Sequence, residues 1–274
     1  MSQAGQRIEN DLNQNMHKSV LLHESIEALD LKPGKIFVDA TYGGGGHSKE
    51  VGRLFPAVEV IAIDQDPEVD AVRANFRDLD KVVARKVDAI LFDLGISTDQ
   101  LEQSGRGFTF LKDEPLDMRI SGEGITASDI LNSWDESALE LVLRGFGEES
   151  NSRRIAREIV EGRKVKPFAT TFDLVKVVGK RRGKIHPATK TFQALRIYVN
   201  QELENLKRGL EGAWKIIKPG GRIAVISYHS LEDRILKNFS REKGQVAKPI
   251  RPSRTEILKN PRARSAKLRI IEKK

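Results

Sequence analysis

The sequence predicts an α/β fold in which a parallel, Rossmann-like sheet carries an inserted all-helical domain. The first observation is a set of short, largely apolar runs, as in strands that are covered on both faces. The second is that helix-compatible segments alternate with these runs, an order typical of a parallel sheet. The third is a stretch from about residue 105 to residue 188 with helical patterns and no strand pattern. The apolar runs are Ile36–Val38, Val58–Ile63, Val87–Phe92 and Arg222–Tyr228.

The change from strand patterns to helical patterns and back divides the chain into three parts. We expect the sheet domain to comprise residues 1–104 and 189–274, with a basic tail at its end, and the helical insertion to comprise residues 105–188. Within the insertion, the apolar spacing predicts four helices. They are Thr126–Trp134, Asp135–Gly145, Ser152–Gly162 and Thr171–Gly179.

The segments after the insertion carry three further expectations. The apolar spacing from Phe192 to Ile217 predicts one long amphipathic helix. Ser230 is expected to cap the next helix, with Asp233 at the capping-box position. The segment Leu268–Ile271 is a candidate for a further strand.

The composition indicates a globular protein with a polyanionic partner. Hydrophobic residues make up 39% and charged residues 31% of the 274 positions, and no apolar run approaches the ~20 residues of a membrane span. The absence of cysteine excludes disulfides and thiolate metal sites and fits a reducing compartment. The net charge of +8 arises from clustered Lys and Arg residues, which favours nucleic acid as the partner. We therefore expect a soluble, cytoplasmic chain with no membrane contact and no bound metal.

The glycine run after the first predicted strand indicates a ligand site. Gly43–Gly46 follow the strand, and a polar, helix-compatible segment begins at His47. Glycines allow a ligand to approach the backbone, and a helix N-terminus offers oriented N–H donors. Ser48 occupies the place of the third glycine, so the strict dinucleotide spacing G-x-G-x-x-G is not met. The alternative interpretation is a flexible turn without a ligand.

Polar residues follow four of the predicted strands, at ends that meet along one edge of a parallel sheet. Asp64 comes about twenty residues after the glycine run, where an acid can accept hydrogen bonds from ribose hydroxyls. The alternative is that Asp64 only caps the next element. This arrangement fits a nicotinamide enzyme and an S-adenosylmethionine enzyme equally well. The strand-end residues are Asp39, Asp64 with Asp66, Asp93, and the turn Ser227–Ser230.

Seven sequence blocks then narrow the choice, because together they resemble one bacterial family. The chain is similar along these blocks to the MraW-type methyltransferases, which methylate the exocyclic N4 amine of a cytosine in the decoding region of 16S ribosomal RNA. The resemblance runs from about His17 to the C-terminus. The blocks are DATYGGGGHS, IDQDP, LFDLGISTDQL, RGFTF-x4-PLDMR, HPATKTFQALRIYVNQELENL, PGGRIAVISYHSLEDR and NPRARS.

The resemblance implies S-adenosyl-L-methionine as the cofactor and places its contacts on matching residues. The glycines suit the methionine part of the cofactor, Asp64 suits the ribose diol, and Phe76 offers an apolar face to adenine. The alternative for Phe76 is a core aromatic. The implied cofactor-binding residues are Gly45, Gly46, His47, Asp64, Phe76, Asp93 and Gln100.

The implied reaction is a direct displacement in which the cytosine amine attacks the methyl group. The lone pair of this amine is delocalised into the ring, so the site must position the amine and accept a proton or hydrogen bond as charge develops. Asp93 is the first candidate for this catalytic acceptor, and His229 is the second. Other amino-methyltransferases have an Asn/Asp/Ser-Pro-Pro-aromatic motif at this place, whereas this chain has Asp93-Leu94-Gly95.

The implied partner is 16S ribosomal RNA within the small ribosomal subunit. Arginine and lysine side chains can pair with phosphates, and an aromatic residue can stack on an unpaired base. The alternatives are solvated charges for the basic residues and a core position for Phe108. The sequence leaves open whether the chain forms a homodimer. The candidate RNA-binding residues are Arg106, Phe108, Lys180, Arg181, Arg182, Lys184, Arg262 and Arg264.

Three stretches, at 66–76, 81–87 and 177–186, are shorter than the family pattern requires. The helix and strand expected between Asp66 and Phe76 do not fit into that length. Either these loops are shorter in this protein, or residues are missing from the sequence at these places. The second alternative is favoured, because losing an interior strand would cost more than the ~5–15 kcal/mol by which a domain is stable.

Three rival functions stay open at this stage. A nicotinamide dehydrogenase is disfavoured by the missing third glycine and the basic tail. A methyltransferase that acts on a different base amine would share the same cofactor site. An RNA-binding ribosome-assembly factor with a retained nucleotide pocket is disfavoured by the intact acids Asp64 and Asp93.

Overall fold

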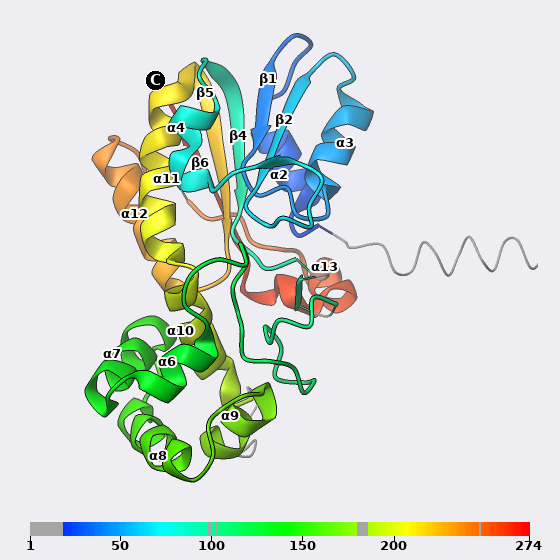
Figure 1. Cartoon of the computed structure of the whole chain (residues 1–274). Coiled ribbons are helices and arrows are strands. Elements are labelled where there is room, and N and C mark those ends of the chain that lie inside the picture. The colour runs from blue at the N-terminus through cyan, green and yellow to red at the C-terminus, as the bar shows by residue number, and fades with distance from the viewer. Residues whose placement is uncertain (1–18, 98–99, 102, 180–185, 247) are drawn as a thin grey trace, which may run out of the picture.

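A computed structural model describes residues 19–97, 100–101, 103–179, 186–246 and 248–274. Within these residues the centre of the molecule is a six-stranded sheet with the order β3-β2-β1-β4-β5-β6. The first five of these strands are parallel, and β6 runs antiparallel to β5 (Figure 1). The predicted Rossmann-like sheet is confirmed. Its strands are β1 (Ile36–Asp39), β2 (Glu59–Asp64), β3 (Val72–Arg73), β4 (Val87–Asp93), β5 (Ile217–Ser227) and β6 (Lys267–Glu272).

Helices cover both faces of the sheet, which explains why its strands lack polar alternation. Figure 1 shows α11 and α12 on one face and α2 and α3 on the other. Successive residues of a strand point to opposite faces, so Val38 packs in the core under α11 and α12 while Phe37 packs in the core under α2 and α3. The helices around the sheet are α2 (Leu22–Ala28), α3 (Gly46–Leu54), α4 (Leu79–Val82), α11 (Glu202–Ile216) and α12 (Ser230–Glu242).

The inserted helices form a second group with an apolar core of their own, seen below the sheet in Figure 1. The four helices predicted in this region are all present, with ends that differ by a few residues. Leu131, Leu143 and Ile155 from three of them meet in this core. The helices are α6 (Ala127–Ser133), α7 (Glu136–Gly147), α8 (Ser152–Val165) and α9 (Thr171–Val178).

The predicted long helix after the insertion is wrong, because the structure divides it in two. Helix α10 (Ala188–Val199) packs against α7 in the core of the insertion, and α11 begins at Glu202. Between them Gln201 has a left-handed backbone with φ 51°. The Asn200 side chain accepts the Ile120 N–H at 2.8 Å and donates to the Met118 carbonyl at 2.8 Å, so it ties the break to the insertion. Apolar spacing is similar on both sides of the break, which is why the periodicity does not reveal it.

The short connection after β2 still contains a strand. It forms β3, which has only two residues, and then the 3-10 helix η1 (Phe76–Asp78), and no α-helix lies between β2 and β3 within the described residues. The length of this stretch argued against a strand here. The structure nevertheless contains one, β3, in a reduced form and at the edge of the sheet rather than in its interior.

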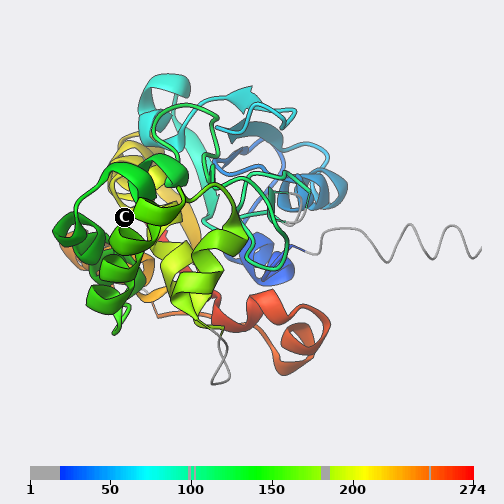
Figure 2. The ribbon, with the colours of Figure 1, turned by 60° about the horizontal axis from the view of Figure 1, so that its bottom comes forward.

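The C-terminal segment packs beside α2, the first helix in the described part of the sheet domain. Helix α13 (Arg254–Lys259) lies beside α2, as Figure 2 shows, and the Glu256 carboxylate accepts the Leu21 N–H at 2.8 Å. The 3-10 helix η2 (Pro261–Ser265) follows. None of the helices in the described part of the chain is long and apolar enough to cross a membrane.

Candidate active site

A cavity of about 660 Å3 lies at the carboxyl ends of β1, β2, β4 and β5. This volume is within the ~300–1,000 Å3 typical of ligand sites. The structure brings six of the seven implied cofactor residues into its lining, while Gly45 lies beside them in the glycine loop. The six are Gly46, His47, Asp64, Phe76, Asp93 and Gln100.

The glycine loop is held in a shape that only glycine allows at position 45. Gly45 has φ +74°, and a Cβ at this position would lie 2.5 Å from the Tyr42 ring. Its N–H donates to the Tyr42 carbonyl at 2.8 Å, and α3 starts directly afterwards. In the first turn of α3, His47 Nε2 donates to the Val20 carbonyl at 3.2 Å, which directs Nδ1 to a point 3.9 Å from Asp93 Oδ2. The glycine loop and the first turn of α3 therefore bring the His47 ring close to Asp93 at the end of β4.

Asp64 is built to accept more hydrogen bonds than the protein supplies. Its two carboxylate oxygens accept the N–H groups of Asp66 at 2.9 Å and Gly43 at 2.8 Å. The side chain is only 9% exposed, and burial raises the pKa of Asp64 above its usual 3.8. Two ribose hydroxyls would add donors and stabilise the ionised form. Asp64 can therefore accept further hydroxyl donors from a ligand in the cavity.

We expect cofactor affinity to fall as the pH falls through the pKa of Asp64. The ionised carboxylate accepts the ribose hydroxyls, so the folded protein below this pKa carries a proton that must leave when the cofactor binds. The dissociation constant of the cofactor should then rise by up to about tenfold per pH unit. Calorimetric titration from neutral to mildly acidic pH measures this rise. Asp64→Asn should bind weakly with a flatter pH dependence, and an equal slope in both proteins would contradict the assignment.

Asp93 is fixed at the end of β4 by Thr41 and Tyr228, which follow the strands β1 and β5. Its backbone N–H donates to Thr41 Oγ1 at 2.6 Å, and the Tyr228 hydroxyl donates to Asp93 Oδ1 at 2.8 Å. Burial, and then the Asp93 carboxylate, raise the pKa of Tyr228 well above 10.0, so the phenol stays a donor at neutral pH. A Cβ on Gly95 would lie 2.8 Å from the Tyr228 ring, so this contact is tightly packed. Tyr228 belongs to the turn Ser227–Ser230 expected at this edge of the sheet, but the sequence does not predict its hydrogen bond to Asp93.

Gln100 reaches the cavity because Asp66 holds it there. Its side-chain amide donates to Asp66 Oδ2 at 2.7 Å, and the Arg106 guanidinium donates to the same oxygen at 2.7 Å. Asp66 is 2% exposed, so its charge needs this partner. Two predicted RNA contacts are corrected at this point: Arg106 lies in the wall behind Gln100, and Phe108 is 6% exposed in the core of the insertion. Neither side chain belongs to an open RNA surface.

Replacing Arg106 with Ala is expected to lower the free energy of unfolding by about 3–5 kcal/mol, because it leaves the buried Asp66 charge without its cation. Denaturant unfolding measures this difference. Arg53→Ala is the matched control, since Arg53 makes an exposed ion pair with Glu50 on α3 and its loss should leave stability nearly unchanged. Equal stability of the two variants, with RNA binding lost only in Arg106→Ala, would restore the RNA-binding interpretation of Arg106.

The other predicted RNA contacts lie at the rim of the cavity or outside the described residues. Arg262 and Arg264 are exposed in η2, and Arg262 lines the cavity together with Lys259. The predicted basic cluster of Lys180, Arg181, Arg182 and Lys184 falls outside the residues that the structure describes.

The start of α12 differs from the prediction, because His229 and not Ser230 is the N-cap. His229 Nδ1 accepts the backbone N–H of Glu232 at 3.5 Å. In return the Glu232 carboxylate accepts the N–H groups of Tyr228 at 2.7 Å and His229 at 3.3 Å. Asp233, expected in the capping box, instead pairs with β6. Glu232 lines the cavity and fixes the backbone of Tyr228, while His229 caps the helix.

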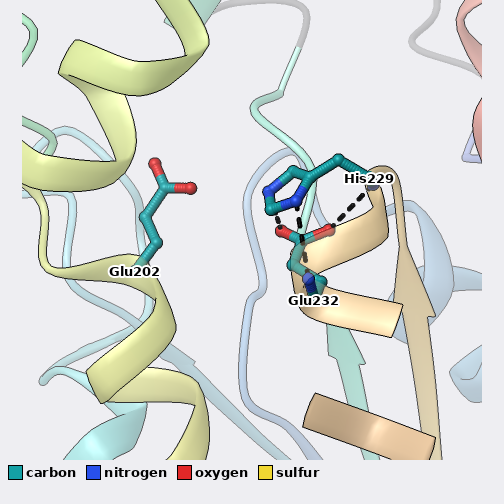
Figure 3. A group of neighbouring side chains, drawn as sticks. All are labelled: Glu202, His229 and Glu232. Atoms are coloured by element: carbon teal, nitrogen blue, oxygen red, sulfur yellow. Dashed lines mark hydrogen bonds and ion pairs between the residues drawn. The ribbon is translucent and has the colours of Figure 1, made fainter. Parts of the chain in front are cut away.

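Glu202, His229 and Glu232 meet at the N-terminal ends of α11 and α12, with one potential ligand atom from each within 4.8 Å of the others (Figure 3). The Glu202 oxygens already pair with the Arg196 guanidinium at 2.8 and 2.9 Å. Because His229 Nδ1 accepts an N–H, a neutral ring carries its proton on Nε2, whereas a metal at Nε2 would need that lone pair. This group does not fit a metal ion.

The parallel sheet, the glycine loop and the strand-end acids around one cavity define an α/β enzyme that binds a nucleoside cofactor. The chain matches the model of the MraW methylase family over residues 14–274, and it belongs to that family. It is therefore a methyltransferase, and its cofactor is S-adenosyl-L-methionine.

Three curated relatives share most of the chain. Each is named "Ribosomal RNA small subunit methyltransferase H". The protein from Caulobacter vibrioides (strain NA1000 / CB15N) is 42% identical over 294 residues, covering 92% of this chain and 94% of the relative. The protein from Deinococcus radiodurans is 44% identical over 282 residues, covering 94% and 89%. The protein from Carboxydothermus hydrogenoformans is 42% identical over 304 residues, covering 94% and 97%.

Proposed function

We propose that this chain methylates N4 of the cytidine at position 1402, in the decoding region of 16S ribosomal RNA. The observation that carries the proposal is the cavity itself, whose lining contains Asp64 and Gln100 together with further acids that can accept hydrogen bonds from an amine. The names of the relatives support small-subunit ribosomal RNA as the substrate. We further propose that the chain works in the cytoplasm and that the insertion at 105–188 helps to select the RNA.

The cofactor supplies a methyl group on a positively charged sulfur. When bound, it would transfer this methyl group to the N4 amine and leave as the neutral thioether, and the proton released from N4 would pass to the carboxylate that accepts its hydrogen bond. Asp93 is the proposed catalytic residue, because its carboxylate can accept a hydrogen bond from the amine and stabilise the positive charge that develops on it. Tyr228 holds one oxygen of Asp93, and His47 stands 3.9 Å from the other. His229 acts through the backbone of Tyr228 and Glu232, as a positioning residue.

Transfer of a labelled methyl group tests the proposed function. Unmodified small subunits and free 16S ribosomal RNA are each incubated with methyl-labelled cofactor, and label is counted in the RNA. We expect label in at least one substrate and, in the same reaction time, about 10²–10⁴-fold slower labelling with Asp93→Asn. Cofactor binding without any label on RNA would instead favour a non-catalytic assembly factor.

A further inference from the structure

A second groove, of about 940 Å3, continues from the catalytic cavity along the junction between the sheet domain and the insertion. The cavity and the groove share three wall residues, Gln65, Asn200 and Asn205. These amides are engaged within the protein: Gln65 accepts a hydrogen bond from Asn75 at 2.6 Å, and Asn205 donates to the Asn200 carbonyl at 2.8 Å. These three polar residues line both the cavity and the groove, and their hydrogen bonds hold them in place.

Four cations from four separate elements line this groove. Arg73 comes from β3, Arg77 from η1, Lys207 from α11 and Arg234 from α12, and the lining contains two acids, Glu123 and Glu204. The lining therefore carries an excess of two positive charges, four cations minus two acids. Such an excess along a groove favours a phosphate backbone.

The ion pairs of these cations leave them accessible to phosphates. Arg73 lies 3.7 Å from Glu123 and Lys207 lies 3.7 Å from Glu204, and both cations are more than half exposed, at 58% and 60%. Exposed pairs of this kind contribute little to stability, so a phosphate can replace the carboxylate. The other two cations also have acidic partners, with Arg77 at 3.2 Å from Asp78 and Arg234 at 3.5 Å from Glu148. Phosphates of an RNA strand in the groove would compete with these carboxylates.

Aromatic side chains occupy the insertion side of the groove. Phe146 and Tyr198 line it, with ring centroids 6.0 Å apart and planes inclined by 55°. Unpaired bases stack on such rings without regard to sequence. The groove therefore offers the two features that single-stranded RNA needs, cations for the phosphates and rings for the bases.

We propose that this groove binds the single-stranded RNA on one side of the target nucleotide, while the rim around Arg262 meets the other side. Only a base that is unpaired, or that has been turned out of its helix, can enter the cavity. When the target lies in a single-stranded segment, its neighbouring nucleotides are unpaired as well and can follow the protein surface. The groove adjoins the cavity at Gln65, Asn200 and Asn205, so nucleotides that leave the cavity on this side would enter the groove. This inference rests on the proposed function, because it assumes that RNA supplies the target base.

Charge reversal in the groove tests the proposal. Lys207→Glu and Arg234→Glu, singly and together, are compared with Lys164→Glu on α8, an exposed lysine that pairs with Glu161 and does not line the groove. Binding of a single-stranded decoding-region RNA is measured over a series of salt concentrations, and methyl transfer is measured at saturating cofactor. The double variant should raise KM for RNA about 10–100-fold with kcat nearly unchanged, and should reduce the salt slope by about 1.4. Cofactor affinity should stay as in the unaltered protein.

Two outcomes would overturn the groove proposal while leaving the proposed function intact. One is an equal effect of the double variant and Lys164→Glu on RNA binding, which would show a general charge effect. The other is a loss of activity on assembled subunits with free RNA binding unchanged, which would assign the groove to a ribosomal protein. If the unaltered protein transfers no methyl group to any RNA, the proposed function itself fails.

Discussion

Replacing Asp93 with Asn is expected to lower kcat for methyl transfer about 10²–10⁴-fold, the range of a lost acid–base or charge-stabilising group. The amide has nearly the same size, so the Tyr228 hydroxyl keeps an oxygen to donate to, but the negative charge opposite the amine is gone. Single-turnover kinetics at saturating cofactor and RNA isolates this step. The cofactor should also bind more weakly, because its positive charge loses a carboxylate.

A surface variant controls for the change of charge. Asp80→Asn removes an exposed ion pair with Lys215 at 2.8 Å and should leave kcat unchanged. Tyr228→Phe should give an intermediate loss of about tenfold, because Asp93 keeps its charge but loses the donor that orients it. A single-turnover rate in Asp93→Asn within threefold of the unaltered protein would remove Asp93 from the reaction.

The second large effect is expected for Gly45→Ala, which should raise the dissociation constant of the cofactor by at least about 100-fold. The left-handed backbone at Gly45 costs an alanine about 1–2 kcal/mol. The new methyl group would lie 2.5 Å from the Tyr42 ring, which lines the cavity and would have to move. Equilibrium dialysis with labelled cofactor measures the affinity.

Gly52→Ala is the matched control for Gly45→Ala, on the same helix. A Cβ at Gly52 would meet nothing within 4 Å, and alanine is the better helix former by about 1 kcal/mol. This variant should bind cofactor normally and unfold at a slightly higher temperature. Normal cofactor binding by Gly45→Ala would show that the loop does not contact the cofactor.

The strands and their acids could be predicted because their signals are local. A parallel strand buried on both faces is apolar along its length, and Asp64 and Asp93 stand directly at the ends of two such strands. The cavity follows from the rule that these ends meet at one edge. The glycine loop likewise carries its own signal, since Gly45 is the residue that tolerates the required backbone.

The missed features depend on contacts between residues far apart in the chain. Arg106 is 40 positions from Asp66, and Tyr228 is 135 positions from Asp93. The residues next to Arg106 in the sequence do not indicate that its charge is paired with a buried acid. The groove cations come from four elements, β3, η1, α11 and α12, that are far apart in the chain, so no local pattern marks them as one group.

The most direct test of the central claim identifies the modified atom in the RNA. After reaction with the unaltered protein, 16S ribosomal RNA is digested to fragments and nucleosides, and mass spectrometry locates and identifies the methylated nucleoside. One methyl group on N4 of the cytidine at position 1402, formed far more slowly with Asp93→Asn, is the expected result. A methyl group on carbon 5, on the ribose or at another nucleotide would contradict the account.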